Sequence, residues 1–397
     1  NPQGSLAGLP ISVKDGICVK NIESAAGSEI LKEYRPPFSA TVINKLEKEG
    51  AIIIGKTSQD EFGFGGLSVN TKKIPKNPHD SARTCGGSSG GAAGFTAFTS
   101  QPHIALGEST GGSIVNPASF CGVVGLTPTY GLVSRYGLID YANSLDKIGT
   151  LAKTVSDSFL GLYHIAGHDE KDSTSLPQKM FHEKKVKKIA VIKESLDVDK
   201  EIKDITLSKL KNYDLISLPS VKKYSLPAYY LIALSEASTN LARYCGLRYG
   251  QTIPLQGDYN EFFTEVRNKY FSKEAKRRII LGTFARMSGF RDAYYLKALK
   301  ARTLIINEYK TAFKKYDILV SPTMPITAPK FSEIEKLTPL ENYMMDILTV
   351  GPNLAGLPHL SLNAGLKNKL PVGIMLTANH LEEEKLRTLG EEIENRS

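Results

Sequence analysis

The sequence of 397 residues lacks the features that mark several large classes of protein. No apolar run reaches the roughly 18–20 residues that span a bilayer, which argues against a membrane protein or a membrane partner. The four cysteines form neither a C-x-x-C pair nor a Cys/His spacing suited to zinc. We therefore expect free thiols, a reducing cytoplasmic compartment and no metal site. The cysteines are Cys18, Cys85, Cys121 and Cys245.

Motifs for nucleotide binding and for the commonest serine hydrolases are also missing. The segment GGSSGG lacks the GK[ST] ending of a P-loop, and no G-x-G-x-x-G follows a predicted strand. A G-x-S-x-G elbow is absent, since residues 111–115 read GGSIV, and no histidine stands in a recognisable constellation. We expect no cofactor in this chain, so that any ATP chemistry would belong to a partner.

The charge of the chain is less informative than its magnitude suggests. A net charge of +9 is compatible with a nucleic-acid partner. The lysines are scattered, as in 45–48 and 184–188, and are not interleaved with aromatic residues. We interpret them as solvated surface, which permits an anionic partner without demonstrating one. The chain begins at Asn1 without a methionine, and we expect a further segment upstream of it.

Short apolar runs alternate with amphipathic stretches, which predicts an α/β sandwich. Residues 8–13 alternate as a strand, 39–49 form a helix capped by Ser39, and 51–56 form a strand buried on both faces. Residues 207–315 are mainly helical and predict an insertion that covers the active site. We expect one domain over 1–397. Further strands are expected at 188–193, 316–325, 359–365 and 371–378, and further helices at 156–166 and 380–395.

Two glycine-flanked serine segments carry the strongest chemical signal, CGGSSGG at 85–91 and STGGS at 109–113. Without a Cβ, glycine lets N–H groups and a hydroxyl approach a reacting carbonyl closely. Acyl transfer also needs a base, and Lys14, on the polar face of the first predicted strand, replaces the missing histidine. We expect burial away from any carboxylate to keep Lys14 uncharged, with Asp15 pointing to the other face.

Each of these segments, taken alone, has a simpler interpretation. A Gly/Ser-rich stretch is often a linker, and a strand lysine is usually exposed. The residues themselves also leave Ser88 and Ser89 equal as the second hydroxyl of a relay.

Taken together, the segments GLPISVKDGI, NPHDSARTCGGSSGG and ALGESTGGSIVNPASFCGVVGLTPTYG resemble the amidase signature enzymes, and weaker similarity extends to the C-terminal helix. The resemblance implies a large mixed β-sheet with helices on both faces. It also implies a triad of Lys14 as base, Ser89 as a bridging serine with a cis peptide bond, and Ser113 as nucleophile. It further implies that the oxyanion hole is formed by the backbone N–H groups around Thr110, Gly111 and Gly112.

One departure concerns the nucleophile loop. The family usually reads DTGGSIR, whereas this chain has Ser109 and Val115 in place of the aspartate and the arginine. We expect both members of a charge couple to have been lost together, which would leave neither buried alone.

Within the family, segments such as PAYYLIALSEASTNLARYCGLRYG and ENYMMDILTVGPNLAGLPHLSL are most similar to A subunits of tRNA-dependent amidotransferases. Such subunits hydrolyse glutamine and pass ammonia to a B subunit, which uses ATP and magnesium to amidate glutamate, or aspartate, on a tRNA. A small C subunit completes the complex, and the tRNA contacts lie largely on the partner. The resemblance places glutamine recognition on Tyr229, Arg278 and Asp346, since arginine binds a carboxylate bidentately and aspartate accepts from an ammonium.

Two other functions remain open at this stage. A stand-alone amidase acting on small aliphatic or aryl amides would carry the same triad. A binding or scaffold protein with an inactive triad would carry it without turnover.

Overall fold

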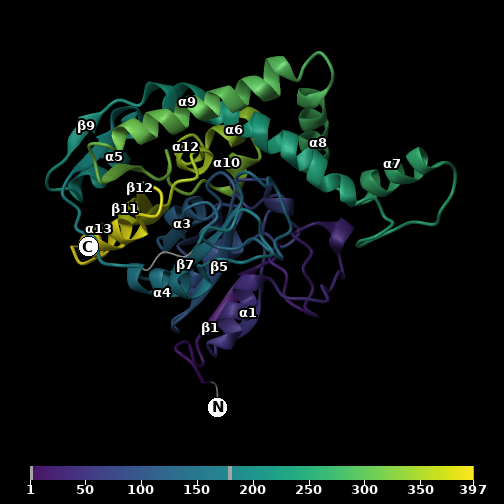
Figure 1. Ribbon diagram of the computed structural model, residues 1–397, viewed down its shortest axis with the longest axis horizontal. Coiled ribbons are helices and arrows are strands. Elements are labelled where there is room, and N and C mark those ends of the chain that lie inside the picture. Colours follow the sequence, from purple (N-terminus) through teal and green to yellow (C-terminus); the bar gives the residue numbers. More distant parts are fainter. Residues whose placement is uncertain (1–2, 178–180, 397) are drawn as a thin grey trace.

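A large mixed β-sheet forms the centre of the molecule. The computed structural model describes residues 3–177 and 181–396, and within them ten strands form one sheet in the order β2-β1-β5-β7-β6-β11-β12-β10-β8-β9 (Figure 1). The strands are β1 (Pro10–Lys14), β2 (Ile52–Thr57), β5 (Ile104–Ser109), β6 (Val124–Thr127), β7 (Lys147–Ala152), β8 (Ile189–Ile192), β9 (Asp214–Ile216), β10 (Ile318–Pro322), β11 (His359–Lys367) and β12 (Leu370–Ala378). A separate hairpin pairs β3 (Lys76–Asn77) with β4 (Asp80–Thr84).

The pairing directions decide where a site can form. β1 runs parallel to β2 and to β5, whereas β5, β7, β6, β11, β12 and β10 are joined by antiparallel pairs. Because β1 and β5 are parallel neighbours, their carboxyl ends, at Lys14 and Ser109, meet at one edge of the sheet. Ligands of α/β proteins bind at such carboxyl ends.

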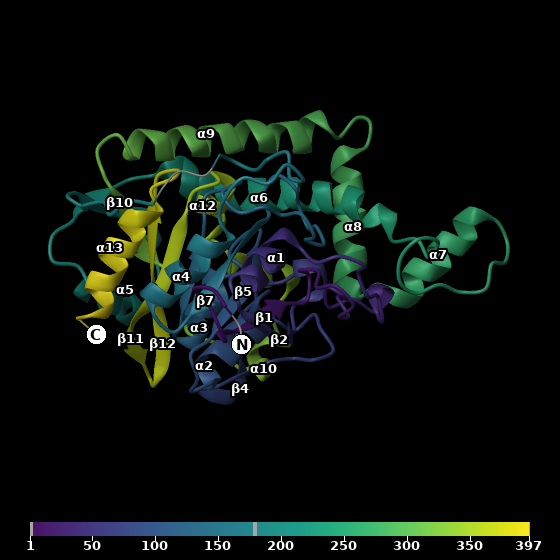
Figure 2. The same cartoon turned by 60° about the horizontal axis from the view of Figure 1, so that its bottom comes forward.

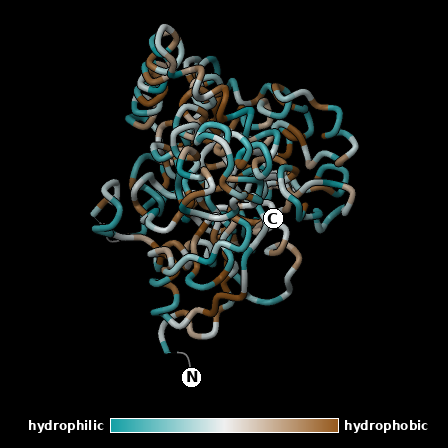
Figure 3. Tube along the Cα trace, turned by 90° about the vertical axis from the view of Figure 1, so that its right-hand side faces the viewer, coloured by the Kyte–Doolittle hydropathy of each residue, from teal (hydrophilic) through white to brown (hydrophobic). Residues whose placement is uncertain are grey.

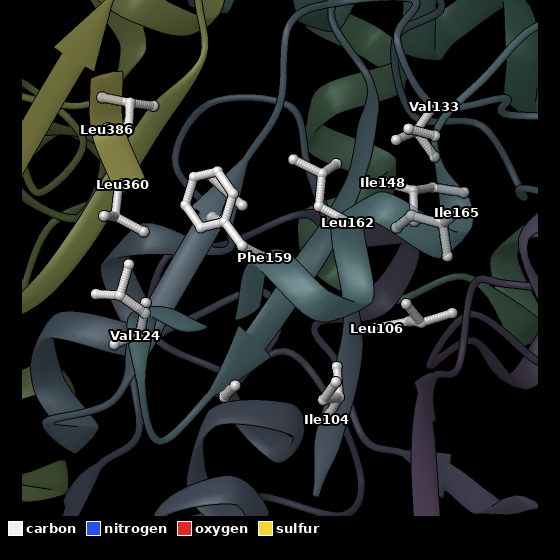
Figure 4. Close-up of a cluster of buried hydrophobic side chains, with 14 of the residues drawn as sticks. Ile104, Leu106, Val124, Val133, Ile148, Phe159, Leu162, Ile165, Leu360 and Leu386 are labelled. Atoms are coloured by element: carbon white, nitrogen blue, oxygen red, sulfur yellow. The ribbon is translucent and has the colours of Figure 1, made fainter. Parts of the chain in front are cut away.

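One face of the sheet carries the largest aliphatic core. It is covered by α1 (Thr41–Lys48), α4 (Val155–Ile165) and α13 (Glu383–Glu394). Phe159 and Leu162, three residues apart on α4, lie between Leu360 of β11 and Ile148 of β7 (Figure 4). α4 starts at a cap, since the Thr154 hydroxyl accepts the N–H of Asp157. The helical period thus turns one apolar stripe toward the strands.

The opposite face is covered by short helices near the site and by long helices beyond them. α2 (Gly90–Phe98) and α3 (Val115–Cys121) pack on each other and on the sheet. The long helices α6 (Pro219–Asn240), α8 (Lys273–Arg286) and α9 (Lys297–Ala312) form the cover, and α7 (Tyr259–Tyr270) extends away from the body (Figures 1 and 2). The remaining α-helices of the described residues are α5 (Lys200–Ser208), α10 (Phe331–Ile334), α11 (Pro339–Met344) and α12 (Val350–Leu354).

The α/β fold is confirmed, and two local predictions were wrong. The strand expected at 51–56 is the edge strand β2, so Ile52 and Ile54 are 49% and 48% exposed instead of buried on both faces. Ser39 does not cap α1, because the helix starts after Ala40 and the Ser39 hydroxyl accepts the N–H of Lys20. The segment 207–315 is mainly helical, as expected, with the short strand β9 before the helices that start at Pro219.

The described residues contain no helix long and apolar enough to cross a membrane. Along the trace, apolar and polar stretches alternate in all parts of the molecule (Figure 3). The four cysteines are free, as expected. Within 3–177 and 181–396, no cluster of three or more His, Cys, Asp or Glu residues is arranged to hold a metal ion.

A buried lysine in β7 makes the stability of the fold depend on pH. Lys147 is 2% exposed, its Nζ donates to the carbonyl of Leu357 at 3.1 Å, and burial lowers its pKa to about 7. Since the unfolded chain binds the extra proton up to its ordinary value of 10.5, Lys147 contributes more stability as the pH rises from about 7 toward 10.5.

We expect Lys147→Met to remove this dependence. The free energy of unfolding of the wild type should rise relative to that of the variant by about 2 kcal/mol between about pH 7 and about pH 9, at ~1.4 kcal/mol per unit. Urea denaturation at several pH values measures it. Lys153→Met, at the exposed position that directly follows β7, is the control and should track the wild type. If the difference in free energy of unfolding between the wild type and Lys147→Met stays constant with pH, the expectation is contradicted.

Candidate active site

Three separate segments meet at the carboxyl ends of β1 and β5. Lys14 ends β1, the loop 110–113 follows β5 and leads into α3, and Ser88 and Ser89 precede α2. The N–H of Ser89 donates to the carbonyl of Ser113 at 3.1 Å, which ties the two serine segments together. Ser88 and Ser89 are 0% exposed and Ser113 is 7% exposed. Ser113 is therefore the most accessible of the three hydroxyls.

The serine that contacts Lys14 is Ser88, whereas the prediction placed Ser89 there. The cis peptide bond joins Gly87 to Ser88, and Lys14 Nζ donates to Ser88 Oγ at 2.7 Å. The Ser89 hydroxyl instead donates to the carbonyl of Glu108 at 3.1 Å. The sequence GGSSGG does not distinguish its two adjacent serines. The direction of the backbone at Gly87 decides which of their hydroxyls faces Lys14.

The expectation that Lys14 is buried away from any carboxylate was also wrong. Lys14 is 0% exposed, and its Nζ lies 2.8 Å from Glu108 Oε2 and 2.9 Å from the carbonyl of Glu108. Asp15 does point elsewhere, as expected, because its carboxylate accepts the N–H groups of Ala25 and Gly27. The sequence signal for Glu108 was a lone acidic residue in the otherwise uncharged strand IALGES.

Glu108 belongs to a buried network that continues away from the lysine. Thr110 Oγ1 lies 2.8 Å from Glu108 Oε1 and 2.8 Å from Asp146 Oδ1. Asp146 Oδ2 accepts the N–H groups of Tyr141 and Ala142, each at 2.9 Å. Burial, together with the nearby charge of Glu108, raises the pKa of Asp146 well above its ordinary value.

The loop before Ser113 presents its backbone. Within the described ranges, the N–H groups of Thr110, Gly111 and Gly112 donate no hydrogen bond to the protein. A Cβ on Gly111 would come within 2.5 Å of the Tyr229 hydroxyl, and one on Gly112 within 2.2 Å of Thr349 Oγ1. Only glycine lets the loop pack this closely, and the free N–H groups fit the oxyanion hole expected there.

The two positions that depart from the family pattern are buried and uncharged. Ser109 and Val115 are both 0% exposed, and the Ser109 hydroxyl has no hydrogen-bond partner among the described residues. Neither position therefore leaves a lone charge in the core.

A pocket of about 310 Å³ is lined by Arg278 and Glu274 of α8 and by Tyr230 of α6. α8 begins after Ser272, whose hydroxyl accepts the N–H of Ala275, and carries Arg278 inward to 3% exposure. Arg278 Nε donates to Glu274 Oε1 at 2.8 Å, and Nη1 donates to the Tyr141 hydroxyl at 2.7 Å. Four aromatic rings surround the guanidinium within 6 Å, namely Phe64, Tyr141, Tyr230 and Tyr343.

Asp346 connects this pocket to the nucleophile segment. Its Oδ2 accepts the Tyr230 hydroxyl at 2.7 Å and its Oδ1 accepts Asn116 Nδ2 at 2.8 Å. Asn116 lies on α3, three residues after Ser113, and burial raises the pKa of Asp346. Arg278 and Asp346, far apart in the sequence, are thus brought to one region of the protein.

The two adjacent tyrosines of α6 have different places. Tyr229, which the sequence analysis assigned to the substrate, lies against Gly111 of the nucleophile loop. Its neighbour Tyr230 lines the pocket and stacks on Tyr343 with ring centroids 4.2 Å apart.

Comparison with known proteins identifies the class to which this fold and site belong. The chain matches the Amidase family over residues 1–386. It therefore belongs to the amidase family, and the predicted resemblance is confirmed.

Within the family, the chain is similar to the A subunit of glutamyl-tRNA(Gln) amidotransferase. It is 46% identical to that subunit from Archaeoglobus fulgidus over 396 residues, which cover 98% of the chain and 86% of the relative. It is 45% identical to that from Halothermothrix orenii, over 96% of the chain and 83% of the relative. The crystal structure of the subunit from Thermotoga maritima superposes with a TM-score of 0.85 at 36% identity, covering 100% of this chain and 85% of that one. A peptide amidase bound to chymostatin superposes with a TM-score of 0.78 at 26% identity, covering 99% and 84%.

The revised position of the bridging serine can be tested by covalent labelling of Ser113 with a fluorophosphonate. Ser88→Ala should slow labelling by roughly 100-fold or more, because it removes the hydroxyl between Lys14 and the nucleophile. Ser89→Ala should slow it by less than about 10-fold, since Ser89 faces the Glu108 carbonyl. Mass spectrometry of the modified peptide measures both rates, and circular dichroism checks folding. The reverse ranking would restore Ser89 as the bridge.

Proposed function

We propose that this chain is the glutamine-hydrolysing subunit of a tRNA-dependent amidotransferase that converts glutamate on tRNA(Gln) to glutamine. The names of relatives at 45–46% identity support this function. The observation that carries it is a buried arginine and a buried aspartate beside one pocket, close to the segment of Ser113. A free amino acid needs this pair of opposite charges, whereas a simple amide does not.

The two charged groups of glutamine match the charges of Arg278 and Asp346. Arg278 keeps Nη2 free of hydrogen bonds to the described residues and can bind the α-carboxylate of glutamine. Asp346 can accept from the α-ammonium, and the adjacent hydroxyls of Tyr229 and Tyr230 bound the space between. The pocket, at about 310 Å³, has the size of a site for a small molecule.

The chemistry follows from the three groups at the strand ends. Ser113 Oγ attacks the side-chain amide carbon while its proton passes to Ser88, which passes its own proton to Lys14. The developing oxyanion is stabilised by the N–H groups of Thr110, Gly111 and Gly112. Ammonia leaves when the relay returns a proton to the nitrogen, and water then releases glutamate from the acyl-enzyme.

The released ammonia implies a partner. We propose that it reaches a B subunit that holds ATP and magnesium and activates the tRNA-linked glutamate, with a small C subunit completing the complex. The tRNA contacts then lie largely on the partner, and the choice between glutamate and aspartate on tRNA is made there. A place in the translation machinery assigns the complex to the cytoplasm, in agreement with the free cysteines.

The assay that tests this function is glutamine hydrolysis by the chain, alone and with co-expressed partner subunits and glutamate-charged tRNA(Gln). We expect ammonia release to rise strongly when the partners are present, and amidated tRNA to form only with ATP and magnesium. Hydrolysis of simple aryl amides without turnover of glutamine under all conditions would instead identify a stand-alone amidase.

Arg278→Lys should raise the KM for glutamine, because lysine cannot offer a bidentate fork to the α-carboxylate. We expect kcat/KM in the complex to fall by roughly 100-fold, while labelling of Ser113 by a fluorophosphonate changes by less than about 3-fold. Arg291→Lys, at an exposed position, is the matched control. Unchanged glutamine kinetics in Arg278→Lys would remove Arg278 from the substrate site.

A further inference from the structure

A continuous chain of buried polar groups starts at Lys14 and leads away from the serines. Lys14 Nζ contacts Glu108 Oε2, Glu108 Oε1 contacts Thr110 Oγ1, and Thr110 Oγ1 contacts Asp146 Oδ1, each at 2.8 Å. All four residues are between 0 and 4% exposed. Their protons therefore exchange with one another more readily than with bulk water.

The Thr110 hydroxyl determines how many protons the carboxyl groups of Glu108 and Asp146 carry between them. Thr110 Oγ1 has one proton and lies 2.8 Å from an oxygen of each of two carboxyl groups. It can donate to one of them, so the other must itself carry a proton and donate to Thr110. Asp146 fits this role, because its other oxygen already accepts two N–H groups and its pKa is raised by burial. Glu108 then remains the carboxylate that balances the ammonium of Lys14.

The contacts of Lys14 show where its proton can go. Nζ directs its hydrogens to Ser88 Oγ, to the Glu108 carbonyl and to Glu108 Oε2. A hydroxyl and a peptide carbonyl are far weaker bases than a carboxylate. Lys14 must lose one proton before it can accept one from Ser88, and the carboxylate is the acceptor within reach.

We propose that Glu108 is the proton acceptor that converts Lys14 from an ammonium into the amine base of the relay, an inference that deepens the proposed function and rests on the same nucleophile. One Nζ–H bond breaks and one Oε2–H bond forms, so that the ion pair becomes a neutral amine beside a neutral acid. The new lone pair on Nζ first faces Oε2, and rotation of the amine about the Cε–Nζ bond turns it toward Ser88. The Ser88 hydroxyl then turns to donate to it and to accept from Ser113.

Thr110 and Asp146 act in this scheme as positioning residues. The Thr110 hydroxyl donates to Oε1, which leaves Oε2 directed at Lys14. The protonated Asp146 holds that hydroxyl in place from the other side. Other titratable groups face the cluster, and they also affect its charge. They are Asp60, in the turn after β2, Asp140, whose charge acts on Asp146, Tyr141, whose ring lies near Gly63, and Arg278 of α8, which contacts Tyr141.

The test compares two buried carboxyl-to-amide changes. In Glu108→Gln the amide oxygen can accept from Lys14 and the amide N–H can donate to Thr110, whose hydroxyl then donates to Asp146 as a carboxylate. The proton acceptor beside Lys14 is lost. In Asp146→Asn the amide can replace the protonated acid, and Glu108 stays intact. The readout is the rate of Ser113 labelling by a fluorophosphonate as a function of pH, on the full chain, with folding checked by circular dichroism.

We expect the wild type to label at a rate that is independent of pH near neutrality, because the proton moves from Lys14 to Glu108 and not to water. In Glu108→Gln the proton must leave to water, so the rate should fall by about tenfold for each pH unit below the range in which Lys14 is uncharged. Asp146→Asn should stay within about 10-fold of the wild type with an unchanged profile. A wild-type rate that itself rises about tenfold per pH unit through neutrality, or a Glu108→Gln profile identical to that of the wild type, would overturn the proposal and leave Glu108 a structural residue.

A second variant covers the case in which Glu108→Gln does not fold. Glu108→Asp keeps a carboxylate and should retain the pH profile of the wild type at a reduced rate, whereas an alkaline-shifted profile would contradict the proposal. Labelling of Ser113 does not need glutamine, so the test of Glu108 does not depend on whether glutamine is the substrate. A wild type that labels but does not hydrolyse glutamine would refute the substrate alone, and a wild type that does not label would refute both.

Discussion

The buried pair between Lys14 and Glu108 is the interaction on which the site depends. An ammonium that is 0% exposed would be very costly in the protein interior without a partner, and removing one member of such a pair costs about 3–5 kcal/mol in other proteins. The pair forms because β1 and β5 are parallel neighbours whose carboxyl ends carry these two residues. Lys14 is therefore held by the strand that also leads into the loop of Ser113.

The rest of the fold holds two kinds of group around that pair. Short helices on one face of the sheet begin at the serine segments, so Ser88 and Ser113 stand on backbone that is fixed by packing of α2 against α3. The long helix α8 of the cover brings Arg278, which we propose recognises the substrate. Arg278 lies in a ring of four aromatic side chains and beside Glu274, which fixes the guanidinium before any ligand arrives. Chemistry and recognition thus come from different layers.

Much of the site could be predicted from motifs because glycine-rich segments have specific backbone requirements. The positions of Lys14, of the serine segments and of the loop at Gly111 and Gly112 follow from that chemistry and from the family resemblance. Ser88 was missed, because a choice between adjacent identical residues is made by backbone geometry. Glu108 was missed because its importance lies in a contact across 94 positions of sequence. The edge position of β2 was missed because an apolar run does not reveal whether a second strand pairs with it.

The sequence by itself determined the class of fold, the family and the residue types that can carry acyl transfer, since apolar periodicity and glycine spacing are local properties of the chain. Only the tertiary structure decided which hydroxyl meets the lysine, which carboxylate neutralises it and how Arg278 and Asp346 come to one pocket. Those outcomes depend on strand order and on the packing of helices far apart in the chain. The charge state of a buried group is set by such neighbours, and no local stretch of sequence contains them.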